Sequence, residues 1–319
     1  MKDSFNRNIS YARVSITDRC NLRCKYCIPD DVSYIPCEDI LRYEEILRLC
    51  GILASMGVNT IRVTGGEPLV RQDCMQLLEN LMDMPGIKHV GLTTNATLLK
   101  PYVKKLADLK SVSINISLDT LSNEGYAKLT GQDKLDDVLS SIEELSKYGI
   151  KTKVNCVPIK GVNDDQIIPL AEIAKNNKIN VRFIELMPSK LNVGMKGIST
   201  DEILNKILQK YTDLQPVSEA LGFGPAKYYK SDGLKGRIGV ISALSHNFCE
   251  ECNRLRVTSQ GFLRLCLHHT NGFDLRKLLR SGSTDEEIKL EIVNAVNNKP
   301  EKHFLQTETN LEAMSSIGG

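Results

Sequence analysis

The sequence predicts an α/β protein built on a parallel β-sheet. Three observations favour this fold class. Short β-branched runs alternate with longer amphipathic stretches, those stretches end in glycine, and unusual polar residues follow the runs. Such alternation implies right-handed crossovers between parallel strands. About six strand–helix units fit before residue 187. This leaves two architectures open: an eight-stranded barrel cut short, or an open doubly wound sheet.

The predicted strands are the runs richest in valine, isoleucine and threonine. They cover residues 12–17, 60–64, 89–94, 111–118, 151–159 and 180–186. Helices are predicted between them, for example over residues 44–57 and 134–149. The second stretch ends at Gly149, and its apolar residues recur at helical spacing: Leu135, Val138, Leu139, Ile142 and Leu145.

The pattern changes at about residue 190. A helix is predicted over residues 200–210, a strand over 237–242, a hairpin over 253–267 that turns at Gln260 and Gly261, and two helices over 273–282 and 284–296. The sequence therefore predicts two regions. Residues 1–190 form the strand–helix region, and residues 191–319 form a C-terminal region that covers one opening of it.

Polar motifs follow most of the predicted strands. They are a cysteine triplet, then "GGEP", "TTN", "SLD" and "ELMP". Ligands of parallel α/β folds bind at the carboxyl ends of the strands. We therefore expect the site at that end of the sheet.

Composition limits the class of protein. The chain has 319 residues, 41% of them hydrophobic, and a formal net charge of +2, so no basic excess favours binding to nucleic acid or to a membrane surface. The N-terminus lacks an apolar core, and no apolar run reaches the ~18 residues of a membrane span. We expect a cytoplasmic protein. Its ten cysteines then indicate metal or redox chemistry rather than disulfides.

The first cysteine set is Cys20, Cys24 and Cys27, in "RCNLRCKYC". Thiolates select zinc, copper(I) or iron–sulfur clusters. A structural zinc needs a fourth ligand, which Cys37 or a distant residue would have to supply. A cubane cluster held by three cysteines instead leaves one iron open to a small molecule. Spacing alone leaves both interpretations open.

A second set follows in the C-terminal region, at Cys249, Cys252 and Cys266. Zinc could recruit His268 or His269 there. The other cysteines, Cys37, Cys50, Cys74 and Cys156, are expected to be ordinary, since Cys50 and Cys74 lie on predicted helices and Cys156 lies within a predicted strand.

Basic residues interrupt three predicted strands, at Arg13, Arg62 and Lys153. A charge within a parallel strand is costly unless it points into a polar cavity. The sequence has no GxxxxGK[ST] phosphate loop. We therefore expect a cavity that holds an anion, with Arg254 and Arg256 as further basic candidates.

"CNLRCKYC" followed by "GGEP" resembles the radical S-adenosylmethionine superfamily. The resemblance implies a partial (β/α)6, TIM-like barrel. It also implies that Cys20, Cys24 and Cys27 hold a catalytic 4Fe–4S cluster that binds S-adenosylmethionine. The residues that it implies around this cofactor are Tyr26, Gly66, Ser117 and Met187.

Nearly the whole chain is similar, in order, to the GTP 3′,8-cyclases of molybdenum cofactor biosynthesis. The similarity runs through "IRVTGGEPLVR", "KVNCVPIKGVNDDQI", "VRFIELMP" and "CNRLRVTSQGFLRLCL". It implies a second 4Fe–4S cluster on Cys249, Cys252 and Cys266, whose open iron contacts guanine. It implies a catalytic role for Arg256 and a tail, Gly318 and Gly319, that threads into the cavity. The GTP-binding residues that it implies are Arg13, Arg62, Thr93, Lys153, Arg254, Leu255 and Arg256.

The implied reaction converts GTP to (8S)-3′,8-cyclo-7,8-dihydroguanosine 5′-triphosphate through a 5′-deoxyadenosyl radical. The implied partners are an electron donor, the cyclic pyranopterin monophosphate synthase that receives the product, and a second copy in a homodimer. Two alternatives remain at this stage: a peptide-maturing radical enzyme with an auxiliary cluster, and a zinc-stabilised nucleic-acid-binding protein.

Overall fold

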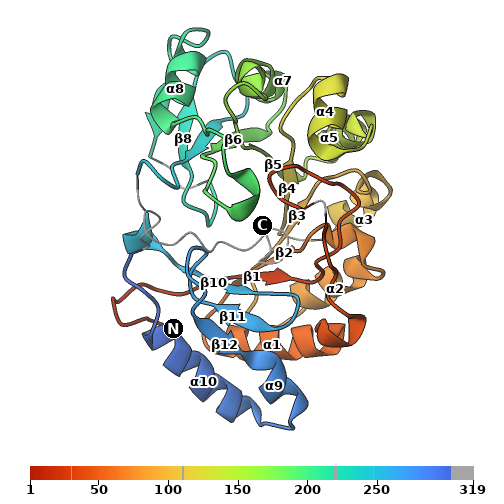
Figure 1. The fold of residues 1–319 in the computed structure, drawn as a ribbon, viewed down its shortest axis with the longest axis vertical. Helices are drawn as coiled ribbons and strands as arrows, with labels where there is room; N and C mark the ends of the chain where they lie inside the picture. Colours follow the sequence, from red (N-terminus) through yellow and green to blue (C-terminus); the bar gives the residue numbers. More distant parts are fainter. Residues whose placement is uncertain (30, 110, 219–220, 247, 303–319) are drawn as a thin grey trace.

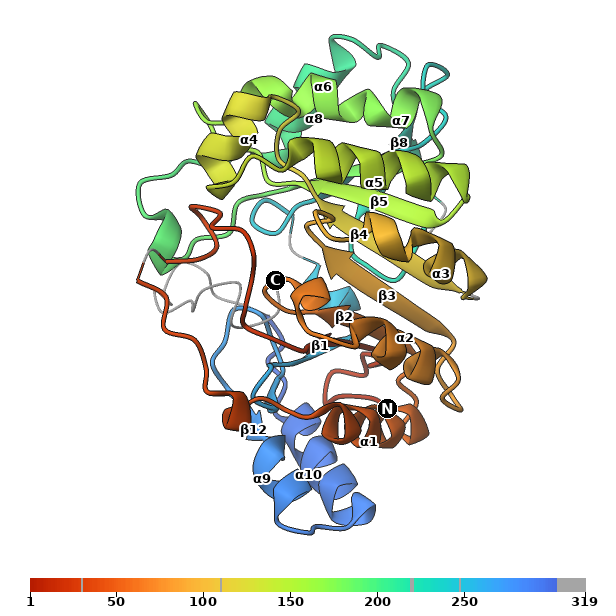
Figure 2. The ribbon, with the colours of Figure 1, turned by 90° about the vertical axis from the view of Figure 1, so that its right-hand side faces the viewer.

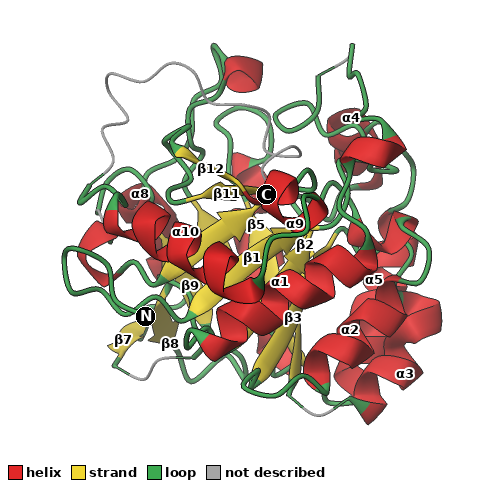
Figure 3. Cartoon of the chain, turned by 90° about the horizontal axis from the view of Figure 1, so that it is seen from below, coloured by secondary structure: helices red, strands yellow, loops and turns green. Residues whose placement is uncertain are grey.

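A computed structural model describes residues 1–29, 31–109, 111–218, 221–246 and 248–302 (Figure 1). Across these ranges the strands join into a single twelve-stranded sheet, in the order β12-β11-β10-β1-β2-β3-β4-β5-β6-β9-β8-β7. The sheet curves around a central space, with helices on its outer side (Figures 2 and 3).

Six parallel strands in sequence order form the middle of the sheet, as the strand–helix alternation predicts. Every neighbouring pair among them is parallel. The predicted strands are confirmed to within three residues at either end, and the fold is the partial TIM-like barrel that the resemblance implies. Their bounds are β1 Tyr11–Ser15, β2 Thr60–Thr64, β3 His89–Thr94, β4 Val112–Ser117, β5 Lys151–Cys156 and β6 Asn180–Ile184.

The second half of the chain extends this sheet at both edges. Strand β10 (Arg254–Val257) pairs parallel with β1, and β9 (Ile238–Ile241) pairs parallel with β6. The predicted hairpin is confirmed as β10 and β11 (Phe262–Arg264), and Gly261 in its turn has a φ of 84°, which L side chains rarely adopt. The outermost strands are β12 (Gly272–Asp274), β8 (Lys227–Lys230) and β7 (Gln215–Val217). The division at residue 190 therefore separates segments of one continuous sheet.

Helices cover the outer face because each carries an apolar stripe. On α5 (Leu135–Lys147), Leu135, Val138, Ile142 and Leu145 are buried, as their spacing predicts, and Leu139 is half-buried. No helix in the described ranges is long and apolar enough to cross a membrane. The other helices are α1 Tyr43–Ser55, α2 Cys74–Met82, α3 Val103–Asp108, α4 Asn123–Thr130, α6 Ile167–Ala171, α7 Ile173–Asn176, α8 Thr200–Leu208, α9 Leu275–Arg280 and α10 Asp285–Asn297.

An ion pair between a buried carboxylate and an exposed arginine attaches the last two helices to the first. Helices α9 and α10 lie beside α1 (Figure 1). Arg280 Nε on α9 lies 2.8 Å from Glu45 Oε1 on α1, and the Glu45 side chain is only 6% exposed. The hydrogen bond from Arg280 lowers the pKa of Glu45 to about 2. The pair therefore stabilises the attachment only while Glu45 is ionised.

We expect Glu45→Gln to lower the free energy of unfolding by about 1–3 kcal/mol at pH 7, because it removes the charge from a buried carboxylate that accepts hydrogen bonds from Arg280. The pKa of Glu45 is lower in the folded chain than in the unfolded chain. Its contribution is therefore complete above about pH 4.5 and is lost as the pH falls toward 2. Urea unfolding at several pH values measures this difference. Glu286→Gln is the control, because the Glu286 side chain is 82% exposed. A difference for Glu45→Gln that stays constant with pH would rule the explanation out.

Candidate active site

One cavity of about 1050 Å³ occupies the space that the sheet encloses, and both cysteine sets line it. The first set follows the carboxyl end of β1. The second set lies at the other end of the strands: Cys252 precedes β10, which runs parallel to β1, and Cys266 follows β11, which runs antiparallel to β10. The cavity therefore has a trio of thiols at each mouth.

The loop after β1 presents the first trio. The backbone N–H of Leu22 and the side-chain amide of Asn95 donate to Cys20 Sγ over 3.4 and 3.8 Å. Burial raises the pKa of the Cys20 and Cys24 thiols. Three thiols on one loop, with two N–H donors aimed at the sulfur of Cys20, suit an iron–sulfur cluster, whose sulfur atoms accept such bonds. Binding it requires the thiols to lose their protons.

The "GGEP" loop packs against the loop that carries the first trio and forms hydrogen bonds that hold it in place. Glu67 accepts hydrogen bonds from Asn95 N at 2.6 Å and from Thr94 Oγ1 at 2.8 Å, which fixes the Asn95 amide near Cys20. A Cβ on Gly66 would collide with the carbonyl oxygen of Arg19. Glycine is therefore needed where this loop lies against the cysteine loop.

All four residues expected around S-adenosylmethionine line the cavity: Tyr26, Gly66, Ser117 and Met187. The Tyr26 hydroxyl donates to Asp119 Oδ2 at 2.5 Å, and Asp119 also accepts from Val157 N at 2.8 Å. Burial raises the pKa of both Tyr26 and Asp119. Asp119 ends the "SLD" motif but is absent from the predicted site, and it fixes the orientation of the Tyr26 ring.

The second trio differs from the first in its electrostatics. Burial alone would raise the pKa of Cys252, but Lys299 and Arg254 outweigh it, so the pKa is lowered. His268 lines the cavity with these cysteines, whereas His269 is not among its lining residues. The remaining cysteines lie outside the site: Cys50, Cys74 and Cys156 are buried as expected, and Cys37 is exposed.

Between the two trios, the face of the sheet that lines the cavity carries a row of arginines, and we call this face the wall. Arg256, Arg13 and Arg62 are aligned across the adjacent strands β10, β1 and β2. On β3 the row continues at Gly91, where any Cβ would collide with the Arg62 guanidinium. That gap lets Arg62 Nη2 reach Ser113 on β4 at 3.1 Å. The predicted cavity for an anion is thus lined by arginines in register.

The charge of this wall is strongly unbalanced. Among the described lining residues there are nine lysines and arginines and one carboxylate, that of Asp119. Burial lowers the pKa of Arg13 to about 10 and that of Arg256 well below its usual value. Arg256 Nη1, Arg254 Nε and Thr93 Oγ1 are buried without a hydrogen-bond partner in the described part of the chain. Such groups are costly to bury, and a polyanionic ligand would satisfy them.

The structure brings together nearly every predicted site residue within its described ranges. Lys153 and Thr93 line the cavity with the arginines. The Leu255 side chain is fully buried in the core on the other face of β10, so a contact from this residue to a ligand would come from its backbone. Gly318 and Gly319 lie outside the described residues.

Sequence reasoning missed Arg182, which lines the cavity from β6 and donates to Asn155 Oδ1 at 2.8 Å. It is a charge inside a predicted strand, so the reasoning used for Arg13 would have found it. Lys299, which is buried and lines the cavity beside the second cysteine set, was also missed.

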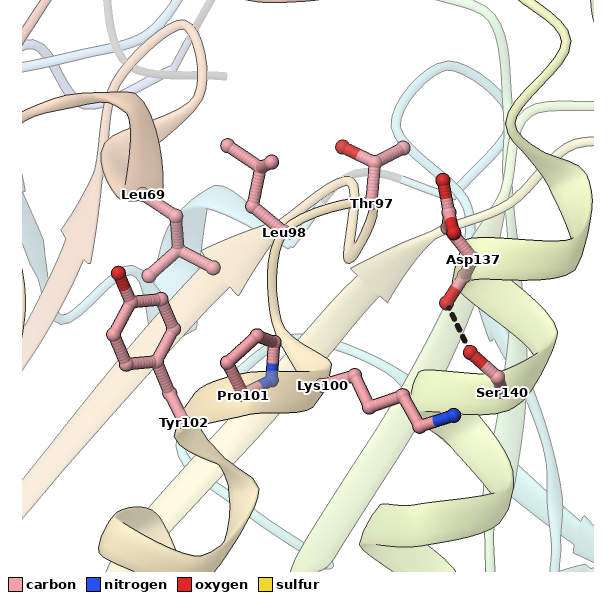
Figure 4. Close-up of a pocket in the computed structure, with 8 residues that line it drawn as sticks. All are labelled: Leu69, Thr97, Leu98, Lys100, Pro101, Tyr102, Asp137 and Ser140. Carbon is pink, nitrogen blue, oxygen red and sulfur yellow. Dashed lines mark hydrogen bonds between the residues drawn. The ribbon is translucent and has the colours of Figure 1, made fainter.

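A second, smaller hollow of about 340 Å³ lies outside the barrel, where α5 meets the segment Lys100–Tyr102 (Figure 4). No cysteine lines it, and Lys100 is its only basic residue. The Ser140 hydroxyl that faces it already donates to the Asp137 carbonyl at 3.0 Å. The central cavity is therefore the candidate active site.

Comparison with known proteins agrees with this geometry. The family model described as Radical SAM superfamily matches residues 14–174, and the one described as Molybdenum Cofactor Synthesis C matches residues 179–305. The chain is 42% identical to a GTP 3′,8-cyclase of Clostridium perfringens (strain SM101) and to one of Thermodesulfovibrio yellowstonii, over the full length of each chain.

A more distant relative and a solved structure extend the comparison. The molybdenum cofactor biosynthesis protein moc-5 of Caenorhabditis elegans is 39% identical, over 94% of this chain and 51% of that protein. The crystal structure of Streptococcus suis SuiB bound to S-adenosylmethionine aligns with a TM-score of 0.67 at 18% identity, covering 90% of this chain and 68% of the other. At that identity the likeness concerns the fold alone.

Proposed function

Because the chain belongs to the GTP 3′,8-cyclase family of radical S-adenosylmethionine enzymes, we propose that its cavity binds S-adenosylmethionine at one mouth and GTP along the arginine row. The enzyme converts GTP to (8S)-3′,8-cyclo-7,8-dihydroguanosine 5′-triphosphate, the first step of molybdenum cofactor biosynthesis. The assignment of residues to the two ligands rests on one observation, the cationic wall that lies between two trios of thiols. The two alternatives left open by the sequence lose their basis, since the full-length relatives are cyclases.

In the proposed site, Cys20, Cys24 and Cys27 hold the first 4Fe–4S cluster. The cluster would supply one electron to S-adenosylmethionine, whose cleavage into methionine and a 5′-deoxyadenosyl radical would provide the chemistry for removing a hydrogen atom from ribose C3′. Gly66, Ser117 and Met187 surround the cofactor, and Tyr26 lies beside its adenine with its ring fixed by Asp119. The protein contributes orientation and exclusion of water.

GTP lies between the mouths in this proposal. Arg13, Arg62 and Arg256 can each bind phosphate oxygens through two N–H groups, whereas Lys153 acts as a point charge. Thr93, Arg254 and the backbone of Leu255 complete the contacts. The guanine then faces a second 4Fe–4S cluster on Cys249, Cys252 and Cys266. Holding C3′ toward the radical and C8 within reach of C3′ accounts for catalysis by placement.

The remaining assignments are proposals of the same standing. Residues 1–190 supply the barrel and the first cluster, and residues 191–319 supply the second cluster and the tail Gly318 and Gly319. An electron donor reduces the clusters, and a cyclic pyranopterin monophosphate synthase takes the product. The working form is a homodimer in the cytoplasm, a reducing compartment that suits free thiols.

Anaerobic turnover with GTP labelled with deuterium at C3′ tests the proposed function. We expect one deuterium in 5′-deoxyadenosine for each cyclised GTP, because the radical removes that hydrogen. The products are measured by mass spectrometry, with unlabelled GTP as the control. Cleavage of S-adenosylmethionine that neither depends on GTP nor carries the label would refute the proposal.

Lys153 makes GTP binding depend on pH in a predictable way. Burial, and then the charges of Arg182 and Arg62, lower the pKa of Lys153 to about 7. At pH 8 the free enzyme thus holds Lys153 mostly neutral. A triphosphate beside it raises the pKa, so binding should take up most of one proton.

Calorimetry of GTP binding at pH 8, in buffers with different ionisation enthalpies, measures this uptake. Lys153→Arg keeps the charge without titrating, and we expect it to bind GTP with no uptake from this position. Lys153→Met should lose both the uptake and affinity. Equal uptake by the parent and Lys153→Arg would show that another group takes the proton.

A further inference from the structure

Lys299 is a buried lysine at the mouth that carries the second cysteine set. It follows α10, is 3% exposed and lines the central cavity. Its ammonium donates to the carbonyl oxygen of Arg254 at 3.1 Å and to that of Leu265. The hydrogen-bond partners recorded for this ammonium within the described ranges are these two carbonyls, neither of which carries a charge.

These two carbonyls belong to the segments that carry the cysteines. Arg254 lies two residues after Cys252, and Leu265 immediately precedes Cys266. One ammonium therefore ties together two segments that approach from different strands, β10 and β11. The tie therefore adds to the pairing of β10 with β11 in holding Cys252 and Cys266 close together.

Arg7 is a second buried cation near the second cysteine set, but its charge is balanced by a carboxylate. Arg7 is also buried and donates to the Cys249 carbonyl at 2.9 Å and to the Pro300 carbonyl at 2.8 Å. Its charge is balanced by Asp3, whose Oδ2 lies 2.6 Å from Arg7 Nε. Among the described residues, the Lys299 ammonium has carbonyl dipoles beside it but no carboxylate partner. A buried ammonium in that state is costly unless an anion shares its site.

We propose that Lys299 is a positioning residue of the second cluster, whose anionic thiolate shell it neutralises while it ties the two ligand segments together. The proposal rests on the proposed function, which places a 4Fe–4S cluster on Cys249, Cys252 and Cys266. A nearby positive charge stabilises the reduced, more negative state of a cluster. Lys299 therefore raises the reduction potential of the second cluster relative to the same site without it.

Three substitutions separate charge from shape. Lys299→Arg keeps the charge, Lys299→Gln keeps a hydrogen-bond donor without the charge, and Lys299→Met keeps neither. Lys277→Gln on α9 is the control, because that side chain is 81% exposed. Each is made in the parent chain and in the chain with Ala at Cys20, Cys24 and Cys27, in which only the second cluster gives a signal.

The measurements are iron per chain and the reduction potential by spectroscopic titration. The parent should hold about eight irons, four for each cubane. We expect Lys299→Arg to match the parent in both. Lys299→Gln should shift the potential of the second cluster to more negative values, and Lys299→Met should also lose iron toward four per chain. Selective loss of iron from Lys299→Gln but not from Lys299→Arg supports the same role of the charge.

Two results would overturn the inference alone: equal potentials in the parent and all three variants, or equal loss of iron from Lys299→Arg and Lys299→Gln. A parent chain that holds only four irons would overturn the proposed function and this inference together. The Lys277→Gln control must match the parent, since a shift there would show that any surface charge moves the potential.

Discussion

Replacing Cys20, Cys24 and Cys27 together by Ala is expected to abolish cleavage of S-adenosylmethionine and to remove about half of the iron. In the proposed site these thiols hold the cluster that supplies the electron, and no other cysteine lines that mouth of the cavity among the described residues. The remaining iron, about four per chain, should stay with the second set. Iron analysis and the yield of 5′-deoxyadenosine measure the two effects.

The corresponding replacement of Cys249, Cys252 and Cys266 should also halve the iron but have a different effect on the chemistry. Some cleavage of S-adenosylmethionine should persist without cyclised GTP, because the first mouth is intact while guanine has lost its anchor. For both triple replacements the control is Cys37→Ala, which removes an exposed thiol that lies outside the cavity but close in sequence to the first set. If the second triple variant lost no iron, the second cluster would be excluded.

Arg256→Ala should reduce kcat/KM for GTP by at least 100-fold, which corresponds to about 3 kcal/mol. The side chain stands at the β10 end of the arginine row, and its Nη1 atom is buried without a hydrogen-bond partner in the described part of the chain. Removing it deletes a charge-assisted contact to phosphate. Cleavage of S-adenosylmethionine in the absence of GTP should change less than about twofold, because the first mouth is untouched.

The same variant should be at least as stable as the parent in the absence of GTP. Burial, and then repulsion from Arg13 and Arg254, already lower the pKa of Arg256, so its removal relieves the unliganded wall. Calorimetry of GTP binding and thermal unfolding with and without GTP measure both effects. Arg276→Ala is the control, because that arginine binds Asp39 outside the cavity. Unchanged GTP affinity in Arg256→Ala would refute the assignment of the wall.

The sequence predicts the core of the fold because its signals are local. The run "TIRVT" has the bounds of β2 itself, and α5 follows its apolar spacing. A charged residue within such a run must face a polar cavity, because burying a charge among apolar side chains is costly. For this reason Arg13 and Arg62 could be identified from the sequence. The three-residue strands β7 and β12 carry too few residues for any pattern.

Other features depend on contacts between distant segments and leave no local signal. Nothing in "NNKP" distinguishes Lys299 from a surface lysine, because its burial results from the packing of residues near 254 and 265. The bond between Tyr26 and Asp119 spans 93 residues. The alternation of side chains along a strand could have shown that the Leu255 side chain faces away from the cavity, since its neighbours Arg254 and Arg256 both line it.

The pairing of β1 with β10 has a consequence for biogenesis. Tyr11 pairs with Arg254, 243 residues later, so one edge of β1 has no partner until that segment emerges from the ribosome. At about 5–20 residues per second this interval lasts roughly 12–50 s.

The first cysteine set and its supporting loops are complete much earlier. Delivery of iron to a nascent chain would therefore create a radical-generating centre beside an unfinished substrate wall. An unpaired strand edge is also a risk for aggregation during that interval. Maturation is safest when cluster insertion follows the docking of β10.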